Sequence, residues 1–300
     1  MTFLKFDDSR VDKSDDGIIK INFYKDNKAL SAQEGFALWG MTLLKSGSMR
    51  FRWNESNPNR DRVLKSICKK NIPVAVEQNH TKIVYEINNI EESCCLVGDG
   101  ILTKNKNLVP VITVADCMPI CLYDVKNGLF GAVHSGWKGT GIAENWIRMA
   151  HQNYGSLPEN ICVAIGAHIH DCCYVVNQER AEYFRNNFSA DCVKEIEDGE
   201  PLCKGSDFVW ENGEGPLYRL SLQKANLALL LKCGIKSENI VILDECTCCN
   251  KNFGSNRRQT SEVMALNCEK EKLSHNEELQ PQKKSSEPCF TVQGAFCGYL

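Results

Sequence analysis

Three side chains that can bind a metal lie at the edges of apolar, β-like runs: His80, Cys117 and His134. Cys117 is part of the segment 115–119 (ADCMP), and His134 opens the segment 134–140 (HSGWKGT). Two imidazoles and one thiolate can hold a single Zn²⁺ and leave a fourth position open for water or substrate. These residue types therefore predict a catalytic zinc site.

The local sequence indicates how two of these ligands could meet. Pro119 follows Cys117 closely, so the chain must turn there and present the thiolate at the end of a strand. If the runs 118–124 and 129–134 form adjacent antiparallel strands, Cys117 and His134 reach the same sheet edge. His80 has to come from another part of the fold, which the sequence does not reveal.

The hydrophobic pattern predicts many short strands with helices between them. Strands are expected at 17–24, 36–44, 82–87, 108–115, 118–124, 129–134, 161–166, 239–244 and 290–300, and helices at 60–71, 141–154, 177–188 and 219–232. Residues 267–288 are rich in Glu, Lys, Ser, Gln and Pro, which cannot build a packed core. We expect one catalytic domain over residues 1–300, with a disordered surface insertion at 267–288.

Composition narrows the class of protein. The chain has 300 residues, of which 43% are hydrophobic, and a formal net charge of −3. This charge gives no electrostatic footprint for nucleic acid, and the apolar runs are too short to span a bilayer. The N-terminus lacks the layout of a signal peptide. We therefore expect a soluble, cytoplasmic protein without nucleic-acid or membrane partners, whose 17 cysteines are reduced thiols.

Six short motifs in a fixed order resemble those of the YfiH family. They are 78–80 (QNH), 115–119 (ADCMP), 134–139 (HSGWKG), 172–176 (CCYVV), 246–249 (CTCC) and 255–258 (SNRR). The family comprises the laccase-domain-containing purine nucleoside phosphorylases, once described as multicopper polyphenol oxidoreductases. The resemblance covers roughly residues 17–265 and the final strand.

The resemblance implies a fold, a metal site and a reaction. The implied fold is α+β, a four-layer α/β/β/α sandwich of mixed sheets. The implied metal ligands are His80, Cys117 and His134. Family members convert adenosine, inosine, guanosine or methylthioadenosine and phosphate to the free base and ribose-1-phosphate, and some also deaminate adenosine. The expected function is thus a zinc-dependent purine nucleoside phosphorylase with adenosine deaminase as a further activity. Its expected partners are a nucleoside and phosphate, and the sequence does not reveal whether a protein partner is required.

Phosphorolysis requires a cation that binds phosphate, and a guanidinium does this with a bidentate fork. Arg258, with Arg257 beside it, is the predicted catalytic and substrate-binding pair. The alternative is an exposed basic turn with no such role.

Two carboxylates and two amides complete the predicted site. Asp99 and Asp116 are candidates for acid–base catalysis or for orienting the histidines, although either could be a plain turn carboxylate. Gln78 and Asn54 could donate hydrogen bonds to the base or the ribose.

Two other metal hypotheses are weaker. The run 246–249 (CTCC) resembles one half of a zinc knuckle, but the chain has no partner pair at ribbon spacing, so packing near the active site is the favoured role. Blue and trinuclear copper centres require many histidines. The chain has six histidines in total, which makes copper less favoured than zinc.

Two functions from other classes remain open. In the first, Cys117 is the thiolate nucleophile of a hydrolase and His134 is its base. In the second, the fold is a non-catalytic module that binds a partner through residues 267–288. Stoichiometric zinc in the purified protein, with Cys117 unreactive to alkylation until a chelator is added, would favour the metal site over the hydrolase. Deletion of 267–288 that removes a co-purifying partner without loss of turnover would support the module.

Overall fold

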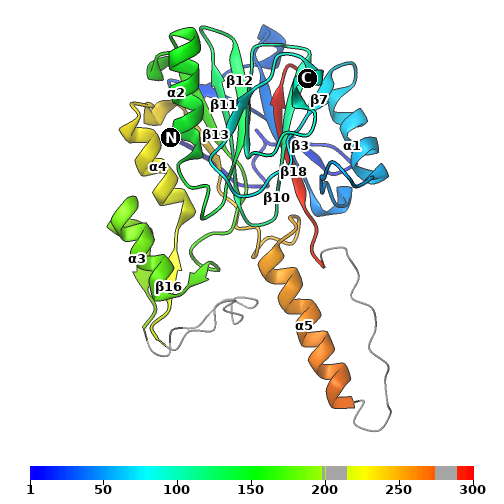
Figure 1. Ribbon diagram of the computed structural model, residues 1–300, viewed down its shortest axis with the longest axis vertical. Coiled ribbons are helices and arrows are strands. Elements are labelled where there is room, and N and C mark those ends of the chain that lie inside the picture. Colours follow the sequence, from blue (N-terminus) through cyan, green and yellow to red (C-terminus); the bar gives the residue numbers. More distant parts are fainter. Residues whose placement is uncertain (198–199, 201–214, 274–288) are drawn as a thin grey trace.

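The computed structural model describes residues 1–197, 200, 215–273 and 289–300, and its centre consists of two mixed β-sheets (Figure 1). The first sheet has seven strands in the order β1-β17-β13-β11-β12-β9-β8. Their bounds are β1 Thr2–Leu4, β17 Ile240–Leu243, β13 Ile161–Ile165, β11 Met118–Asp124, β12 Leu129–Ser135, β9 Gly100–Thr103 and β8 Val84–Glu86. Strands β11 and β12 are antiparallel, whereas β13 and β17 are parallel.

The second sheet has six strands in the order β2-β3-β6-β18-β10-β7. Their bounds are β2 Asp12–Lys13, β3 Ile18–Asn22, β6 Leu38–Thr42, β18 Gln293–Gly298, β10 Leu108–Val114 and β7 Ile72–Val74. Two small sheets complete the strands: β14 Val175–Val176, β16 Tyr218–Leu220 and β15 Val193–Glu195 in one, and β4 Tyr24–Lys25 and β5 Lys28–Ala29 in the other.

The described helices lie on the outer faces of the two large sheets or below them (Figure 1). They are α1 Pro58–Cys68, α2 Ile142–Tyr154, α3 Gln178–Asn187, α4 Leu222–Lys232 and α5 Asn256–Leu273. Short 3₁₀ turns occur at Ala32–Glu34, Leu44–Ser46, Ile90–Ser93, Pro158–Asn160, Ala190–Cys192 and Ser237–Asn239.

The two large sheets pack face to face, and helices cover both outer faces. Trp39 of the six-stranded sheet and Phe130 of the seven-stranded sheet belong to the apolar cluster between them. Trp146 of α2 and Leu230 of α4 pack on the outer face of the seven-stranded sheet, and α1 covers the other outer face through Leu64 and its neighbours. The predicted four-layer α/β/β/α sandwich is therefore confirmed.

Sheets covered on both faces explain the sequence pattern of the central strands. Every residue of β11 and β12 is buried. A strand buried on both faces reads as a continuous apolar run rather than as an alternating one. This is why the segments 118–124 and 129–134 could be identified as strands, and the structure confirms both.

The helix boundaries follow ordinary capping rules. The side chain of Asn57 accepts a hydrogen bond from the Arg60 amide, and Pro58 is the first residue of α1. Gly234, just after α4, has a φ of 85°, a left-handed conformation that glycine adopts without a Cβ clash. The helix predicted at 60–71 therefore begins two residues earlier and ends at Cys68.

The expected disordered insertion at 267–288 needs a correction. The backbone of residues 267–273 continues α5 to Leu273. Glu, Lys and Leu are good helix formers and this stretch contains no Pro or Gly, so its polar composition does not prevent a helix. Residues 274–288 lie outside the described residues. Within the described part of the chain, none of the helices has the length and apolar character needed to cross a membrane.

Candidate metal centre

The three predicted metal ligands converge on one point. The ligand atoms of His80, Cys117 and His134 all lie within 4.8 Å of one another, and Cys117 Sγ is 3.8 Å from His80 Nε2. Around a tetrahedral zinc with Zn–S near 2.3 Å and Zn–N near 2.05 Å, sulfur and nitrogen stand about 3.6 Å apart. The donor set and its spacing therefore fit a single zinc-sized ion.

Two neighbouring strands and one loop bring these ligands together. Cys117 immediately precedes β11, and His134 on β12 is the antiparallel partner of Pro119 on β11. The expectation that Cys117 and His134 meet at one sheet edge is confirmed. His80 comes from the loop between β7 and β8 and has a φ of 56°, a left-handed backbone that is uncommon for a residue with a side chain.

Asp99 fixes the positions of both histidines. This carboxylate is fully buried, and its Oδ1 lies 2.8 Å from His134 Nδ1 and accepts a hydrogen bond from the His80 amide at 3.0 Å. Its Oδ2 accepts from the Thr81 amide at 2.6 Å and from the Thr81 hydroxyl at 2.7 Å. A carboxylate on the far nitrogen of a metal-binding histidine sets the tautomer and the ring orientation. His134 consequently presents Nε2 to the centre.

The electrostatics of the site favour a thiolate beside an imidazolium when no metal is bound. Burial raises the pKa of Cys117, but the positive charge and hydrogen bonds of His134 and His80 lower it to about 6. Burial lowers the pKa of His134, but the Cys117 thiolate and the Asp99 carboxylate raise it to about 9. Cys117 is thus prepared as an anionic ligand at neutral pH, whereas His134 must lose a proton before it can coordinate a metal.

A cavity of about 220 Å³ opens beside His80 and Cys117. Its lining includes two arginines, two aromatic residues, an amide and a carboxylate: Arg180, Arg257, Trp137, Tyr174, Asn256 and Asp116. The two guanidinium groups make the cavity suitable for an anion, and the aromatic rings offer a surface for a planar group. The metal centre therefore borders a space that can hold a small anionic or aromatic substrate.

The cavity arginines are held in place by the aromatic wall. The Arg180 guanidinium lies over the Trp137 ring, 4.3 Å from its centroid, and donates a hydrogen bond to the Tyr174 hydroxyl at 3.3 Å. Arg257 is buried, and its Nη2 donates to the Val175 carbonyl at 3.3 Å. Burial lowers the pKa of Arg257.

Asp116 connects the metal centre to the cavity wall. Its φ of 79° turns the chain sharply between β10 and Cys117. One carboxylate oxygen accepts from the Thr247 hydroxyl at 2.6 Å and the other from the Arg257 amide at 2.7 Å. Burial raises the pKa of Asp116, against the lowering effect of these hydrogen bonds. Asp116 is thus a buried carboxyl group that lines the cavity, and its raised pKa makes it easier to protonate than a free carboxyl group.

The predicted role of Arg258 needs a correction. Its guanidinium is buried away from the cavity lining and donates to the backbone carbonyls of Thr247, Cys248 and Phe253. These carbonyls occupy the donors that phosphate would need. Arg258 therefore holds the 247–253 loop, and Arg257 remains as the cavity-facing member of the pair.

Three other predicted residues lie away from the cavity lining. The Gln78 side chain hydrogen-bonds Thr113, since it accepts from the Thr113 amide and hydroxyl and donates to its carbonyl. Asn54 is exposed. Asp99 faces the histidines rather than the cavity, which corresponds to the orienting role in the prediction rather than to the acid–base one.

Sequence reasoning missed several cavity residues. Trp137 and Tyr174 lie within motifs at 134–140 and 172–176, so their position in those motifs was an available signal. Arg180 comes from the first turn of α3 and has no local signal in the sequence.

Comparisons with known proteins give a family match and several relatives. The family model described as "Multi-copper polyphenol oxidoreductase laccase" matches residues 54–265. A purine nucleoside phosphorylase of Clostridium acetobutylicum is 31% identical over 183 residues, which are 59% of this chain and 66% of that protein. Adenosine deaminase RL5, from an unknown prokaryotic organism, is 28% identical over 177 residues, or 56% of this chain and 60% of that protein. The chain thus spans less than two thirds of the length of both relatives.

A solved structure shares the fold over almost the whole chain. The crystal structure of the hypothetical protein YfiH from Bacillus licheniformis superposes with a TM-score of 0.71 and 21% sequence identity. The superposition covers 97% of this chain and 99% of that one. At this identity the likeness concerns the fold alone.

Proposed function

Because this chain belongs to the family described as multi-copper polyphenol oxidoreductase laccase, the YfiH family, we propose that it is a zinc-dependent purine nucleoside phosphorylase. Its substrates are adenosine, inosine, guanosine or methylthioadenosine together with phosphate. Its products are the free base and ribose-1-phosphate. The relatives named purine nucleoside phosphorylase support this choice of reaction.

One observation carries the proposal: a His₂Cys donor set borders a cavity that also contains two arginines. The donor set suits zinc with one position left open. The arginines suit phosphate, which a guanidinium binds through two parallel hydrogen bonds. A cavity that places a metal beside an anion-binding wall is what a phosphorolytic reaction needs.

In the proposed reaction, a phosphate oxygen bonds to C1′ of the ribose while the bond from C1′ to the purine nitrogen breaks. Arg257 and Arg180 bind and orient the phosphate. The leaving purine takes up a proton, and Asp116, whose pKa burial raises, is the proposed donor. His80, Cys117 and His134 would hold the zinc, which supplies a Lewis acid and an acidified water or substrate oxygen when bound.

Adenosine deamination is a second candidate function, favoured by the relative named adenosine deaminase. This reaction replaces the amino group at C6 of adenine with an oxygen from water and releases ammonia. The open position of the metal centre and the buried carboxyl group of Asp116, whose pKa is raised, would serve it as well. The two reactions differ in their need for phosphate.

The experiment that tests the proposal is a nucleoside panel assayed with and without phosphate. The zinc-loaded protein should release the free base and ribose-1-phosphate from at least one purine nucleoside, and only when phosphate is present. Inosine formed from adenosine without phosphate would establish the deaminase activity. Failure to cleave any of the four nucleosides in the presence of phosphate would refute the phosphorylase.

The same arrangement of the Cys117 thiolate and the His134 imidazole would also suit a cysteine nucleophile and its base. The hypothesis that the chain is a cysteine hydrolase therefore needs a direct test. If Cys117 binds zinc, iodoacetamide should modify it only after a chelator has removed the metal. Rapid alkylation of Cys117 in protein that still contains its full zinc would favour the hydrolase. Metal analysis of the same sample also distinguishes zinc from copper.

A further inference from the structure

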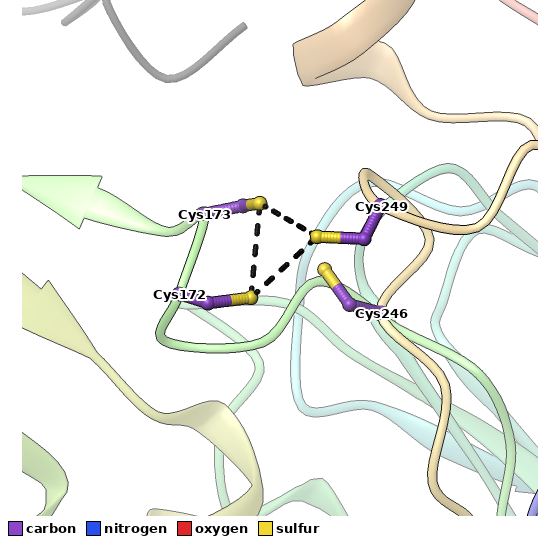
Figure 2. A group of neighbouring side chains, drawn as sticks. All are labelled: Cys172, Cys173, Cys246 and Cys249. Carbon is purple, nitrogen blue, oxygen red and sulfur yellow. Dashed lines mark hydrogen bonds between the residues drawn. The ribbon is translucent and has the colours of Figure 1, made fainter. Parts of the chain in front are cut away.

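Four cysteines from two distant loops form a second cluster of possible metal ligands (Figure 2). Cys172 and Cys173 lie in the loop between β13 and β14, and Cys246 and Cys249 lie in the loop that follows β17. Figure 2 shows the four sulfur atoms turned toward one another. The sequence reveals only the Cys246–Cys249 half, because its partners lie more than seventy residues away along the chain.

The backbone holds the two loops side by side without help from the thiols. The His168 amide donates to the Glu245 carbonyl at 3.2 Å, and the Thr247 amide donates to the His168 carbonyl at 3.0 Å. These bonds form an isolated β-bridge between His168 and Cys246. The cluster is therefore built on a paired backbone and not on chance contact of exposed side chains.

The spacing of the sulfur atoms matches a tetrahedral metal–thiolate site. Cys172 Sγ lies 3.7 Å from Cys173 Sγ and 3.8 Å from Cys249 Sγ, and Cys173 Sγ lies 3.3 Å from Cys249 Sγ. All four sulfur atoms lie within 4.8 Å of one another. Around a tetrahedral zinc with Zn–S bonds near 2.3 Å, the sulfur atoms stand about 3.8 Å apart. A disulfide would require about 2.05 Å, so none of these pairs is bonded.

Hydrogen-bond donors and positive charges lie beside the cluster. The His170 amide donates a hydrogen bond to Cys246 Sγ at 3.4 Å. Two arginines bind the backbone of the same loops: Arg219 donates to the Cys172 carbonyl at 2.7 Å, and Arg258 donates to the Cys248 carbonyl at 2.9 Å. Four thiolates around Zn²⁺ carry a net negative charge, and these guanidinium groups offset part of it.

We infer that Cys172, Cys173, Cys246 and Cys249 bind a second zinc ion, a structural one separate from the His80, Cys117 and His134 centre. A site with four protein ligands leaves no open position for chemistry and contributes to folding instead. This inference does not depend on which reaction the chain catalyses.

The second ion would stabilise the wall of the cavity. Tyr174, which lines the cavity, directly follows Cys173. Thr247, which donates to Asp116, lies between Cys246 and Cys249. The ion would link these two segments, so its loss should increase the mobility of both Tyr174 and Asp116.

Metal analysis of purified variants tests the inference. The wild-type chain, expressed with zinc, should contain two zinc ions, and Cys117→Ser and Cys249→Ser should each contain one. Cys94→Ser/Cys95→Ser is the matched control, because these adjacent cysteines are exposed and their sulfur atoms are 3.5 Å apart, yet they lie outside the four-cysteine cluster. The control should keep both ions. Unchanged zinc content in Cys249→Ser, or a single zinc in the wild-type chain, would overturn the inference.

X-ray absorption on Cys117→Ser gives a second test that leaves the cluster intact. Its remaining zinc should be surrounded by four sulfur atoms at about 2.3 Å. A first shell of mixed nitrogen and sulfur, no zinc at all, or a Cys173–Cys249 disulfide in protein kept under reducing conditions would contradict a four-cysteine site.

Discussion

At the residue scale, the two buried carboxylates of the site have different surroundings. Asp99 accepts hydrogen bonds from four groups on the His80 loop and contacts His134, so its oxygens are committed to positioning. Asp116 lines the cavity, and burial raises its pKa. The sequence identified both carboxylates but could not separate their roles, because the difference depends on which distant segments each one faces.

Asp99→Asn should weaken metal binding at the first centre by about 10- to 100-fold, the usual effect of losing a carboxylate behind a metal-binding histidine. An amide retains only one acceptor oxygen, so it can serve either His134 and the His80 amide, which share Oδ1, or the two Thr81 donors at Oδ2, but not both sets. Competition with a chromogenic chelator measures the change. Asp124→Asn, which alters another fully buried carboxylate that caps a hairpin turn, is the control. Equal zinc affinity in wild type and Asp99→Asn would refute the positioning role.

Metal uptake at the first centre should depend on pH. Because the pKa of His134 is about 9 and that of Cys117 about 6, His134 is protonated and Cys117 ionised between these values. Zinc must then displace one proton, so its apparent affinity should rise about tenfold per pH unit from about pH 6 to 9. Below about pH 6 the rise should be steeper, since Cys117 must also ionise. Chelator competition in Cys249→Ser isolates this centre, and an affinity that is constant between pH 6.5 and 8.5 would contradict the coupling.

Arg180 and Arg258 should differ in their effects, the first on phosphate binding and the second on the stability of the fold. Arg180→Ala should raise the KM for phosphate at least tenfold with little change in thermal stability, because this guanidinium lines the cavity. Arg258→Ala should instead cost about 2–4 kcal/mol of stability, because it leaves several buried backbone carbonyls without donors. Steady-state kinetics and thermal unfolding separate the two effects. An Arg258→Ala protein that unfolds at the wild-type temperature but binds phosphate poorly would reverse these assignments.

At the scale of elements, the sequence predicted the strands well because their apolar runs are long and end at clear turns. The runs at 118–124 and 129–134 correspond to β11 and β12, and their antiparallel pairing places Cys117 and His134 together. The path of His80 was not predictable, because it depends on how the loop after β7 folds onto Asp99. Arg258 was misassigned for a similar reason, since its partners are carbonyl groups of a loop.

The turn after β12 has little room for a larger residue. A Cβ added at Gly136 would lie 3.0 Å from both Cys117 Sγ and His80 Cδ2. Gly136→Ala should therefore displace two ligands by a few tenths of an ångström and lower zinc affinity at the first centre by about tenfold. Gly128→Asn, in a hairpin turn with no neighbour within 4 Å of the added Cβ, is the control. Chelator competition measures both, and wild-type affinity in Gly136→Ala would show that the turn tolerates the methyl group.

At the scale of the whole molecule, the chain passes from one large sheet to the other at the metal centre. β10 belongs to the six-stranded sheet and β11 to the seven-stranded sheet, and the segment 115–117 connects them. The sharp turn at Asp116 thus places Cys117 where both sheets, the His80 loop and the 246–249 loop meet. The order of the sequence motifs resembles that of a known family, and this resemblance predicted the four-layer fold. The cavity and the four-cysteine cluster were not predictable, because they arise from long-range contacts that no local sequence pattern encodes.

The most direct measurement is zinc-dependent phosphorolysis by chelator-treated protein. Removal of the metal should lower ribose-1-phosphate formation at least about a hundredfold, and added Zn²⁺ should restore it in the wild-type chain but not in Cys117→Ser. Metal-free protein that cleaves the nucleoside at the original rate, or Cys117→Ser that recovers full activity with zinc, would contradict a catalytic ion held by His80, Cys117 and His134.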